Sequence, residues 1–204
     1  MFFRNTNQIL VSEETKMNRR TVTRTVVVVA LMLELGVTGA YAQHPRRHVK
    51  MTFSGTNMAT TINLQANTVT DEMLAAGNSS LGRFTFRELH ADGVAPKPPA
   101  DCAGPSFGVL KGAGVFRFGD GSLLIVTLKE GSGCVNLVER FSALIVNYEI
   151  NGGTGRFEDA SGELTMTATQ TPVLRNAADA PALLPITGQF AGTIFRAEPE
   201  NDSR

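Results

Sequence analysis

The chain has 204 residues, and its 19 Lys and Arg balance 19 Asp and Glu, so the formal net charge is zero. This length suits one domain with a short leader, and the lack of a basic excess argues against a nucleic-acid partner. The sequence has no Trp and two Tyr, which argues against the aromatic girdles of a membrane-inserted barrel.

An export signal is predicted near the start of the chain. Residues 25–37 (TVVVVALMLELGV) are apolar apart from Glu34. A basic segment with the pair Arg19-Arg20 precedes this run, and an Ala-Tyr-Ala sequence that ends at Ala42 follows it. Basic residues, a short apolar run and an A-x-A site are together typical of a secretory signal peptide. The run is shorter than the roughly 20 residues that a transmembrane helix needs.

The predicted signal peptide covers residues 17–42, because Met17 stands directly before the basic segment. Residues 1–16 are then an extension from an upstream start codon, and residues 43–204 are a single mature domain. The general export route and the twin-arginine route both remain open. The mature domain has 14 Lys and Arg against 16 Asp and Glu, and we expect it to be secreted or periplasmic.

The two cysteines of the chain, Cys102 and Cys134, both lie in the predicted mature domain. An even pair in an exported protein usually forms a disulfide. Neither cysteine has a His or a second Cys at the spacing of a metal site. We therefore predict a Cys102–Cys134 disulfide and no bound metal.

Strands are predicted from Val49 onward, because apolar and polar residues alternate with period two. Asp120-Gly121 and Asn151-Gly152 are strong hairpin-turn signals between such segments. The alternating apolar positions are Val49, Met51, Phe53, Ile62, Leu64, Ala66, Phe84, Phe86, Phe116, Phe118, Leu164, Met166, Ala168, Phe190 and Ile194.

Three segments depart from the alternating pattern. Residues 70–77 (TDEMLAAG) have an N-cap Thr, acids in the first turn and a final Gly, which predicts a short helix. Residues 91–105 and 175–185 are rich in Pro and Ala and are predicted to be long loops. We predict an all-β fold of about eight short strands, either a sandwich or a barrel. A closed antiparallel barrel is preferred, because closure leaves no unpaired strand edge.

A glycine-rich segment, NGGTGRFEDASG, occupies residues 151–162. A phosphate-binding loop would need Gly-x4-Gly-Lys-Ser/Thr, and this segment has no Lys. We interpret it as a structural turn built on Gly152, Gly153 and Gly155. One helical turn would then place Phe157 as a plug against the core.

The stretches YEINGGTGRFEDASGELTMTAT and GQFAGTI, with SSLGRFTF and FRFGDGSLL before them, resemble the allene oxide cyclase barrel-like domain of bacterial secreted proteins. That domain is related to plant allene oxide cyclases and dirigent proteins. The resemblance covers most of the mature domain, and its specific part is Gly-Gly-Thr-Gly-Arg-Phe with the following Ala-Ser-Gly. Glu158-Asp159 departs from the small residues usual there. The resemblance implies an eight-stranded antiparallel barrel with an apolar interior, and it carries no catalytic residue over to this chain.

Two sets of candidate site residues follow from the alternation. The first set would line an apolar cavity for a small hydrophobic ligand; its members are Phe84, Phe86, Phe116 and Phe118. The second set is Glu88 and His90, which continue the same strand face toward the barrel mouth and could perform acid–base chemistry. Asp71, Glu72 and Glu139 are expected to serve caps or turns. No cofactor is predicted.

Three functions remain open from the sequence. The favoured one is a non-enzymatic barrel that binds a small apolar molecule or a macromolecular partner. The first alternative is an isomerase or cyclase that acts on an unsaturated apolar substrate, as the resemblance implies. The second alternative is a structural or assembly module that works as a homo-oligomer.

Overall fold

The computed structural model describes residues 46–93, 102–176 and 181–195. The predicted signal peptide and the extension before it lie outside these residues. No helix in the described part of the chain is long and apolar enough to cross a membrane. The elements are β1 (Arg46–Asn63), β2 (Thr68–Ser79), β3 (Gly82–Gly93), β4 (Ser106–Phe118), β5 (Leu123–Asn136), β6 (Phe141–Thr154), the 3-10 helix η1 (Gly155–Phe157), β7 (Ser161–Gln170), β8 (Leu174–Arg175) and β9 (Pro181–Phe195).

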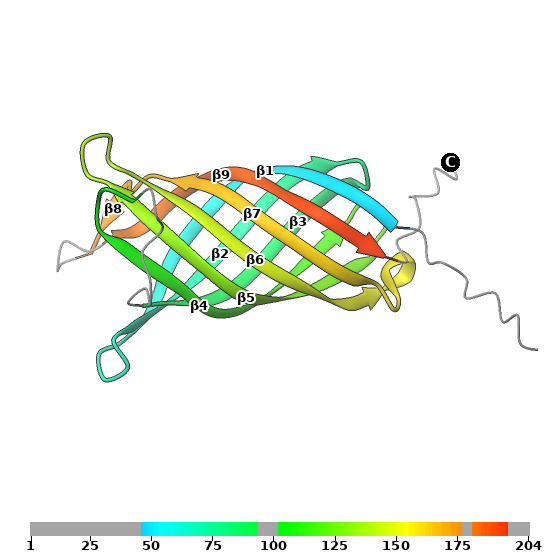
Figure 1. Ribbon diagram of the computed structural model, residues 1–204, viewed down its shortest axis with the longest axis horizontal. Coiled ribbons are helices and arrows are strands. Elements are labelled where there is room, and N and C mark those ends of the chain that lie inside the picture. Colours follow the sequence, from blue (N-terminus) through cyan, green and yellow to red (C-terminus); the bar gives the residue numbers. More distant parts are fainter. Residues whose placement is uncertain (1–45, 94–101, 177–180, 196–204) are drawn as a thin grey trace, which may run out of the picture. The chain divides into compact units, whose positions relative to one another are not determined.

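Eight of the strands form a closed antiparallel barrel (Figure 1). Strands β1 to β7 pair in chain order, and β9 lies between β7 and β1. Phe195 at the end of β9 is in register with Arg46 on one side and with Ser161 on the other. The short strand β8 pairs with the beginning of β9, on the side where β7 has ended. The predicted closed barrel is therefore confirmed, with one additional strand.

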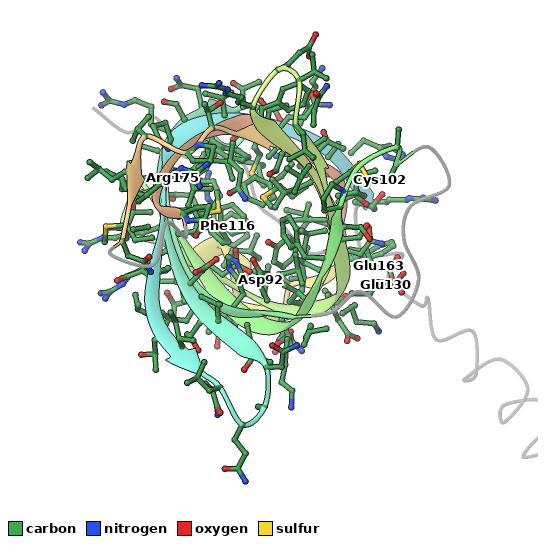
Figure 2. The ribbon with its side chains drawn as sticks, turned by 90° about the vertical axis from the view of Figure 1, so that its left-hand side faces the viewer. Asp92, Cys102, Phe116, Glu130, Glu163 and Arg175 are labelled. Carbon is green, nitrogen blue, oxygen red and sulfur yellow. A yellow bond between two sulfur atoms is a disulfide. The ribbon has the colours of Figure 1, made fainter. Side chains whose placement is uncertain are left out.

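One hydrophobic cluster fills the middle of the barrel, because every second side chain of each strand points inward. Viewed along the barrel, Phe116 lies inside the ring of strands, whereas Glu130 and Glu163 lie outside it (Figure 2). Aromatic rings meet across strands: the centroids of Phe86 and Phe116 are 4.3 Å apart, and those of Phe116 and Phe190 are 4.9 Å apart. Packing of this kind fills the interior of a small barrel with side chains.

The predicted helix at residues 70–77 is wrong, because this segment lies within β2. Asp71, Met73 and Ala75 point inward, while Leu74 is 42% exposed on the outer face. Pairing with β1 and β3 along its whole length outweighs the helical preference of a segment rich in Glu, Met, Leu and Ala. The described residues contain one 3-10 turn and no α-helix.

The predicted long loops are shorter than expected. β3 continues to Gly93, and β9 already begins at Pro181, so residues 91–93 and 181–185 are strand. Residues 94–101 and 177–180 lie outside the described part of the chain.

The predicted buried face at Ile62, Leu64 and Ala66 is wrong. β1 ends at Asn63, and all three side chains are exposed, because the chain turns there toward β2 beyond the core.

The glycine-rich turn closes the opposite end of the barrel from β8 (Figure 1). β6 runs through Asn151 and Gly152 to Thr154, so the reversal occurs later than the Asn-Gly signal predicts, at η1. Phe157 at the end of η1 is fully buried, with its ring centroid 4.7 Å from that of Phe118. Phe157 thus closes this end together with the nearly buried Arg156 side chain, whose guanidinium lies 4.9 Å from the Phe118 and Phe157 ring centroids and 3.2 Å from Asp120 Oδ2.

Candidate functional site

Buried polar side chains gather inside the barrel toward the β8 end. On β3, the inward positions change from Phe84 and Phe86 to Glu88 and then His90. Asp71 on β2 stands directly opposite His90 in the β2–β3 register. Glu88, His90 and Asp71 are 1%, 6% and 7% exposed, so strand alternation has placed three ionisable groups in the interior.

Glycines on β4 make room for this cluster. Gly114 and Gly112 are the register partners of Glu88 and His90. A Cβ atom on Gly112 would lie 2.7 Å from the Cβ of His90, and one on Gly114 would lie 2.5 Å from the Phe86 ring. Both distances are too short for real side chains, so these positions need glycine.

His90 is surrounded by carboxyl groups. Its Nε2 lies 3.9 Å from Asp71 Oδ2 and 3.7 Å from Asp92 Oδ1, and its Nδ1 lies 3.7 Å from Glu88 Oε2. These distances exceed those of hydrogen bonds, and neither ring nitrogen has a hydrogen-bond partner among the described residues. Burial lowers the pKa of His90 to about 4, so its imidazole is neutral at pH 7.

Tyr148 on β6 anchors Glu88 from the other side of the barrel. The Tyr148 hydroxyl lies 3.1 and 3.0 Å from the two carboxyl oxygens of Glu88 and donates to this group. Burial raises the pKa of Glu88 to about 7, and the hydrogen bond from Tyr148 opposes part of that rise. Burial, followed by the nearby Glu88 charge, raises the pKa of Tyr148 well above its usual value, so the tyrosine remains a donor.

Asp71 and Asp92 form a close acidic pair. Burial first, and then the neighbouring Asp71 charge, raise the pKa of Asp92 to about 8. Burial also raises the pKa of Asp71, against the lowering effect of hydrogen bonds with Asp92 and Asn57. Asn57 Nδ2 lies 3.4 Å from both Asp71 Oδ2 and Gln170 Oε1. The polar cluster thus extends across β1, β2, β3 and β7.

A cavity of about 660 Å³ opens over this cluster at the β8 end of the barrel. Figure 2 looks toward this end and shows Asp92 inside the ring of strands. Asp71, Asp92, Ser142 and Gln170 supply buried or nearly buried polar groups to the cavity. Its apolar lining includes Ala59, Val69, Phe107, Leu137, Phe141 and Leu184.

The sequence-predicted site residues fall into two regions of the interior. Glu88 and His90 lie together in the polar cluster. The aromatic set is Phe84, Phe86, Phe116 and Phe118, which pack against one another deeper in the barrel, and none of these four lines the cavity at the mouth. Their role in ligand binding therefore stays a prediction.

Sequence reasoning missed several members of the cluster. Asp92 lies two residues after His90 on β3, so the period-two alternation that places Glu88 and His90 inward also predicts an inward Asp92. Asp71 is predicted from the sequence to serve a cap or turn of a short helix, and this prediction is wrong because the residue lies within β2 with its side chain buried. The remaining members, Asn57, Tyr148 and Gln170, sit at inward positions of their strands, but no local motif distinguishes them from ordinary core positions.

Comparisons of this chain with protein-family profiles, with curated proteins and with solved structures find no match. The site must therefore be interpreted from its own geometry.

Proposed function

We propose that the barrel binds a small molecule that has an apolar body and one polar end, within the cavity at its mouth. The observation that carries this proposal is an apolar-lined cavity that ends on buried polar side chains. Its volume of about 660 Å³ falls within the range of roughly 300–1,000 Å³ that is typical of small-molecule sites. The apolar body would lie against side chains such as Phe107 and Leu184, and the polar end would reach Asp71, Asp92 or Gln170.

The mouth cavity supports this role better than a second cavity nearby. That cavity, of about 800 Å³, lies beside the Cys102–Cys134 disulfide. Its lining includes Asn136 and Glu139, which lie within hydrogen-bonding distance of each other in the β5–β6 loop, and Val138, which is 91% exposed. Specific ligand sites combine an apolar lining with a few convergent polar groups. Both cavities have an apolar lining, and the mouth cavity adds the buried polar side chains of Asp71, Ser142 and Gln170.

A separate proposal concerns the resemblance to the allene oxide cyclase barrel-like domain. An eight-stranded antiparallel barrel is what that resemblance implies, and the Gly-Gly-Thr-Gly-Arg-Phe segment leads from β6 into η1 at a corner of the barrel. We propose membership of that family on these two observations.

A second candidate function is isomerisation or cyclisation of an unsaturated apolar molecule in the same cavity. The observation that favours it is the position of Asp71 and Asp92, two carboxyl groups beside a histidine, where the cavity meets the core. Positioned carboxyl groups can transfer protons to and from a bound substrate.

We further propose that the mature protein works in an oxidising, extracytoplasmic compartment. Cys102 and Cys134 form a disulfide whose Cα atoms are 5.6 Å apart, and disulfides persist mainly in such compartments. The experiment is N-terminal sequencing of protein recovered from the cell exterior or periplasm, and a chain that begins at Gln43 is expected. A chain recovered in the cytoplasm with Met1 or Met17 in place would contradict the proposal.

The ligand proposal is tested by native mass spectrometry of the protein from the host that makes it, together with titration by the fluorescent apolar probe N-phenyl-1-naphthylamine. A retained molecule of constant mass is expected, and the same spectra report the number of subunits. Ala59 lines the cavity. Ala59→Phe should weaken probe binding about 10-fold, because the added ring occupies part of the space in which the probe binds. Ala113→Phe, on the exposed outer face of β4, is the matched control. Equal probe affinity in both variants would contradict the proposal.

The second candidate is separated from simple binding by an exchange experiment. The retained molecule is incubated with fresh protein in D2O. Deuterium incorporation that Asp92→Asn abolishes would support the enzyme, whereas recovery of the unlabelled molecule would support a binding module.

A further inference from the structure

We propose that Asp71, His90 and Asp92 form a binding site for a divalent transition-metal ion, with Zn²⁺ as the ion that best fits their donor atoms. The donor atoms of these three side chains all lie within 4.8 Å of one another. This inference does not depend on the small-molecule ligand proposed above, because it rests on the polar cluster alone.

The first argument is that these side chains hold buried polar atoms without partners. Asp71 Oδ1, Asp92 Oδ1 and both ring nitrogens of His90 have no hydrogen-bond partner among the described residues. A buried polar group without a partner destabilises the folded state, and such groups in a native protein call for an explanation. Carboxylate oxygens and an imidazole nitrogen all offer lone pairs, so one cation near His90 Nε2 can satisfy that nitrogen and Asp92 Oδ1 at once.

The second argument is the triangle that the donor atoms form. His90 Nε2 lies 3.9 Å from Asp71 Oδ2 and 3.7 Å from Asp92 Oδ1. A tetrahedral ion with bonds of about 2.0–2.1 Å separates its ligands by roughly 3.4 Å. The two distances from His90 Nε2 would therefore shorten by about 0.5 Å or less, and the distance between the two carboxylate oxygens, which lies within 4.8 Å, would shorten by about 1.4 Å at most; adjustments of side-chain torsions can supply these movements.

The third argument is the support behind His90. A metal-bound histidine usually donates its second ring N–H to a carboxylate, which fixes the ring and its tautomer. Here Nε2 faces Asp71 and Asp92, while Nδ1 faces Glu88 Oε2 at 3.7 Å. Tyr148 in turn holds the Glu88 carboxyl group at 3.0 and 3.1 Å. This order of groups is the usual one behind a metal-binding histidine, although the 3.7 Å between Nδ1 and Glu88 Oε2 is longer than a hydrogen bond.

The donor set narrows the choice of ion. One imidazole with two carboxylates suits Zn²⁺ and neighbouring transition metals. Ca²⁺ and Mg²⁺ favour sites made entirely of oxygen donors, and soft ions favour thiolates, whereas both cysteines of this chain are joined in the disulfide. Asp71 and Asp92 also line the mouth cavity, so the remaining coordination positions would face a water molecule or a ligand there. Three protein ligands with one open position are typical of catalytic Zn²⁺ sites.

The experiment measures metal binding by the full-length protein after removal of bound ions with a chelator. Mass spectrometry of the eluted metal gives the stoichiometry after dialysis against ZnSO4, and competition with a chromophoric chelator gives the affinity. One Zn²⁺ ion per chain is expected. His90→Gln and Asp92→Asn should each weaken binding at least 100-fold, and Glu88→Gln should weaken it about 10- to 100-fold through the orientation of His90. His48→Gln is the matched control, because His48 is exposed on β1, where it lies 3.3 Å from the Thr193 hydroxyl.

A second measurement needs no variant and so does not depend on whether the variants fold. Addition of Co²⁺ to the metal-free protein should give visible d–d absorption bands of a four- or five-coordinate ion, and Zn²⁺ should remove them. Absence of these bands, or Zn²⁺ affinity that is equal in His90→Gln and His48→Gln, would overturn the inference. If the protein binds Zn²⁺ but does not bind the apolar probe, the metal site is supported and the proposed small-molecule binding is contradicted.

Discussion

The Tyr148 hydroxyl lies 3.0 and 3.1 Å from the two carboxyl oxygens of Glu88, across the barrel interior and 60 residues away along the chain. Both residues are 1% exposed. This contact ties β3 to β6, which are not neighbours in the sheet, and it holds a buried acid in one orientation.

Tyr148→Phe should therefore destabilise the protein by about 1–3 kcal/mol, because it leaves a buried carboxyl group without its donor. The free energy of unfolding from urea titration checks this value. A double-mutant cycle with Glu88→Leu, which removes the acceptor, should give a coupling free energy of about 1 kcal/mol or more. Additive effects of the two changes would show that the contact contributes nothing.

The stability of the chelator-treated, metal-free protein should fall as the pH rises from 6.5 to 8. The pKa is about 7 for Glu88 and about 8 for Asp92 in the folded state, whereas the ordinary values are 4.5 and 3.8. Between pH 6.5 and 8 the unfolded chain has already released these protons and the folded state still holds them, so a rise in pH favours the unfolded chain. His90 has the opposite effect, but only below pH 6.5, because burial lowers its pKa from 6.5 to about 4. The expected loss is roughly 2–3 kcal/mol.

Urea unfolding at several pH values measures this slope. Glu88→Gln should make the loss smaller, mainly below about pH 7, and Asp92→Asn should remove the larger share, which runs through the whole window to about pH 8. A stability that stays constant or rises between pH 6.5 and 8 would contradict the assignment of raised pKa values to these two acids.

Removal of the Cys102–Cys134 disulfide should lower the free energy of unfolding by about 3–4 kcal/mol. The bond closes a loop with a sequence separation of 32 residues, and the unfolded chain gains the corresponding freedom when it is cut. Thermal unfolding with and without a reducing agent measures the effect. A variant with alanine at both positions should show the same lowered stability, and the reducing agent should not change it further.

Gly153→Ala should cost about 2–4 kcal/mol, because a Cβ atom at this position would lie 1.9 Å from the backbone oxygen of Leu123. Gly121→Ala is the matched control. Its φ of +85° strains an alanine, but nothing lies within 4 Å of the added atom, so a cost of about 1–2 kcal/mol is expected. Equal destabilisation by the two changes would show that steric overlap at the β5–β6 contact is not the cause.

Alternation along the strands was sufficient to predict the barrel and the orientation of Glu88 and His90. It failed at residues 70–77, where Leu74 faces out and Asp71 faces in, so hydrophobicity there gives no period-two signal. The helix prediction there rests on end signals alone, namely an N-cap Thr, acids in the first turn and a final Gly, and such signals do not register pairing with neighbouring strands.

The rest of the polar cluster depends on register between distant strands. Asp71 meets His90 because β2 and β3 pair without a shift over this stretch, and Tyr148 meets Glu88 because the barrel closes around both. Neither condition is visible in a local stretch of sequence, since closure is a property of the whole sheet.

The closing strand β9 has a consequence for the order in which the protein matures. It pairs with β1 along one edge, over Arg46 to Met58, and with β7 along the other edge, over Ser161 to Gln170. A growing chain therefore cannot complete the ring until its final strand has emerged from the ribosome. Until then, the free flanks of β1 and β7 are open to foreign β-strands. β1 therefore stays unpaired along one edge until β9 is present. A truncation within Pro181–Phe195 should leave both edges open and yield aggregates in place of a smaller barrel.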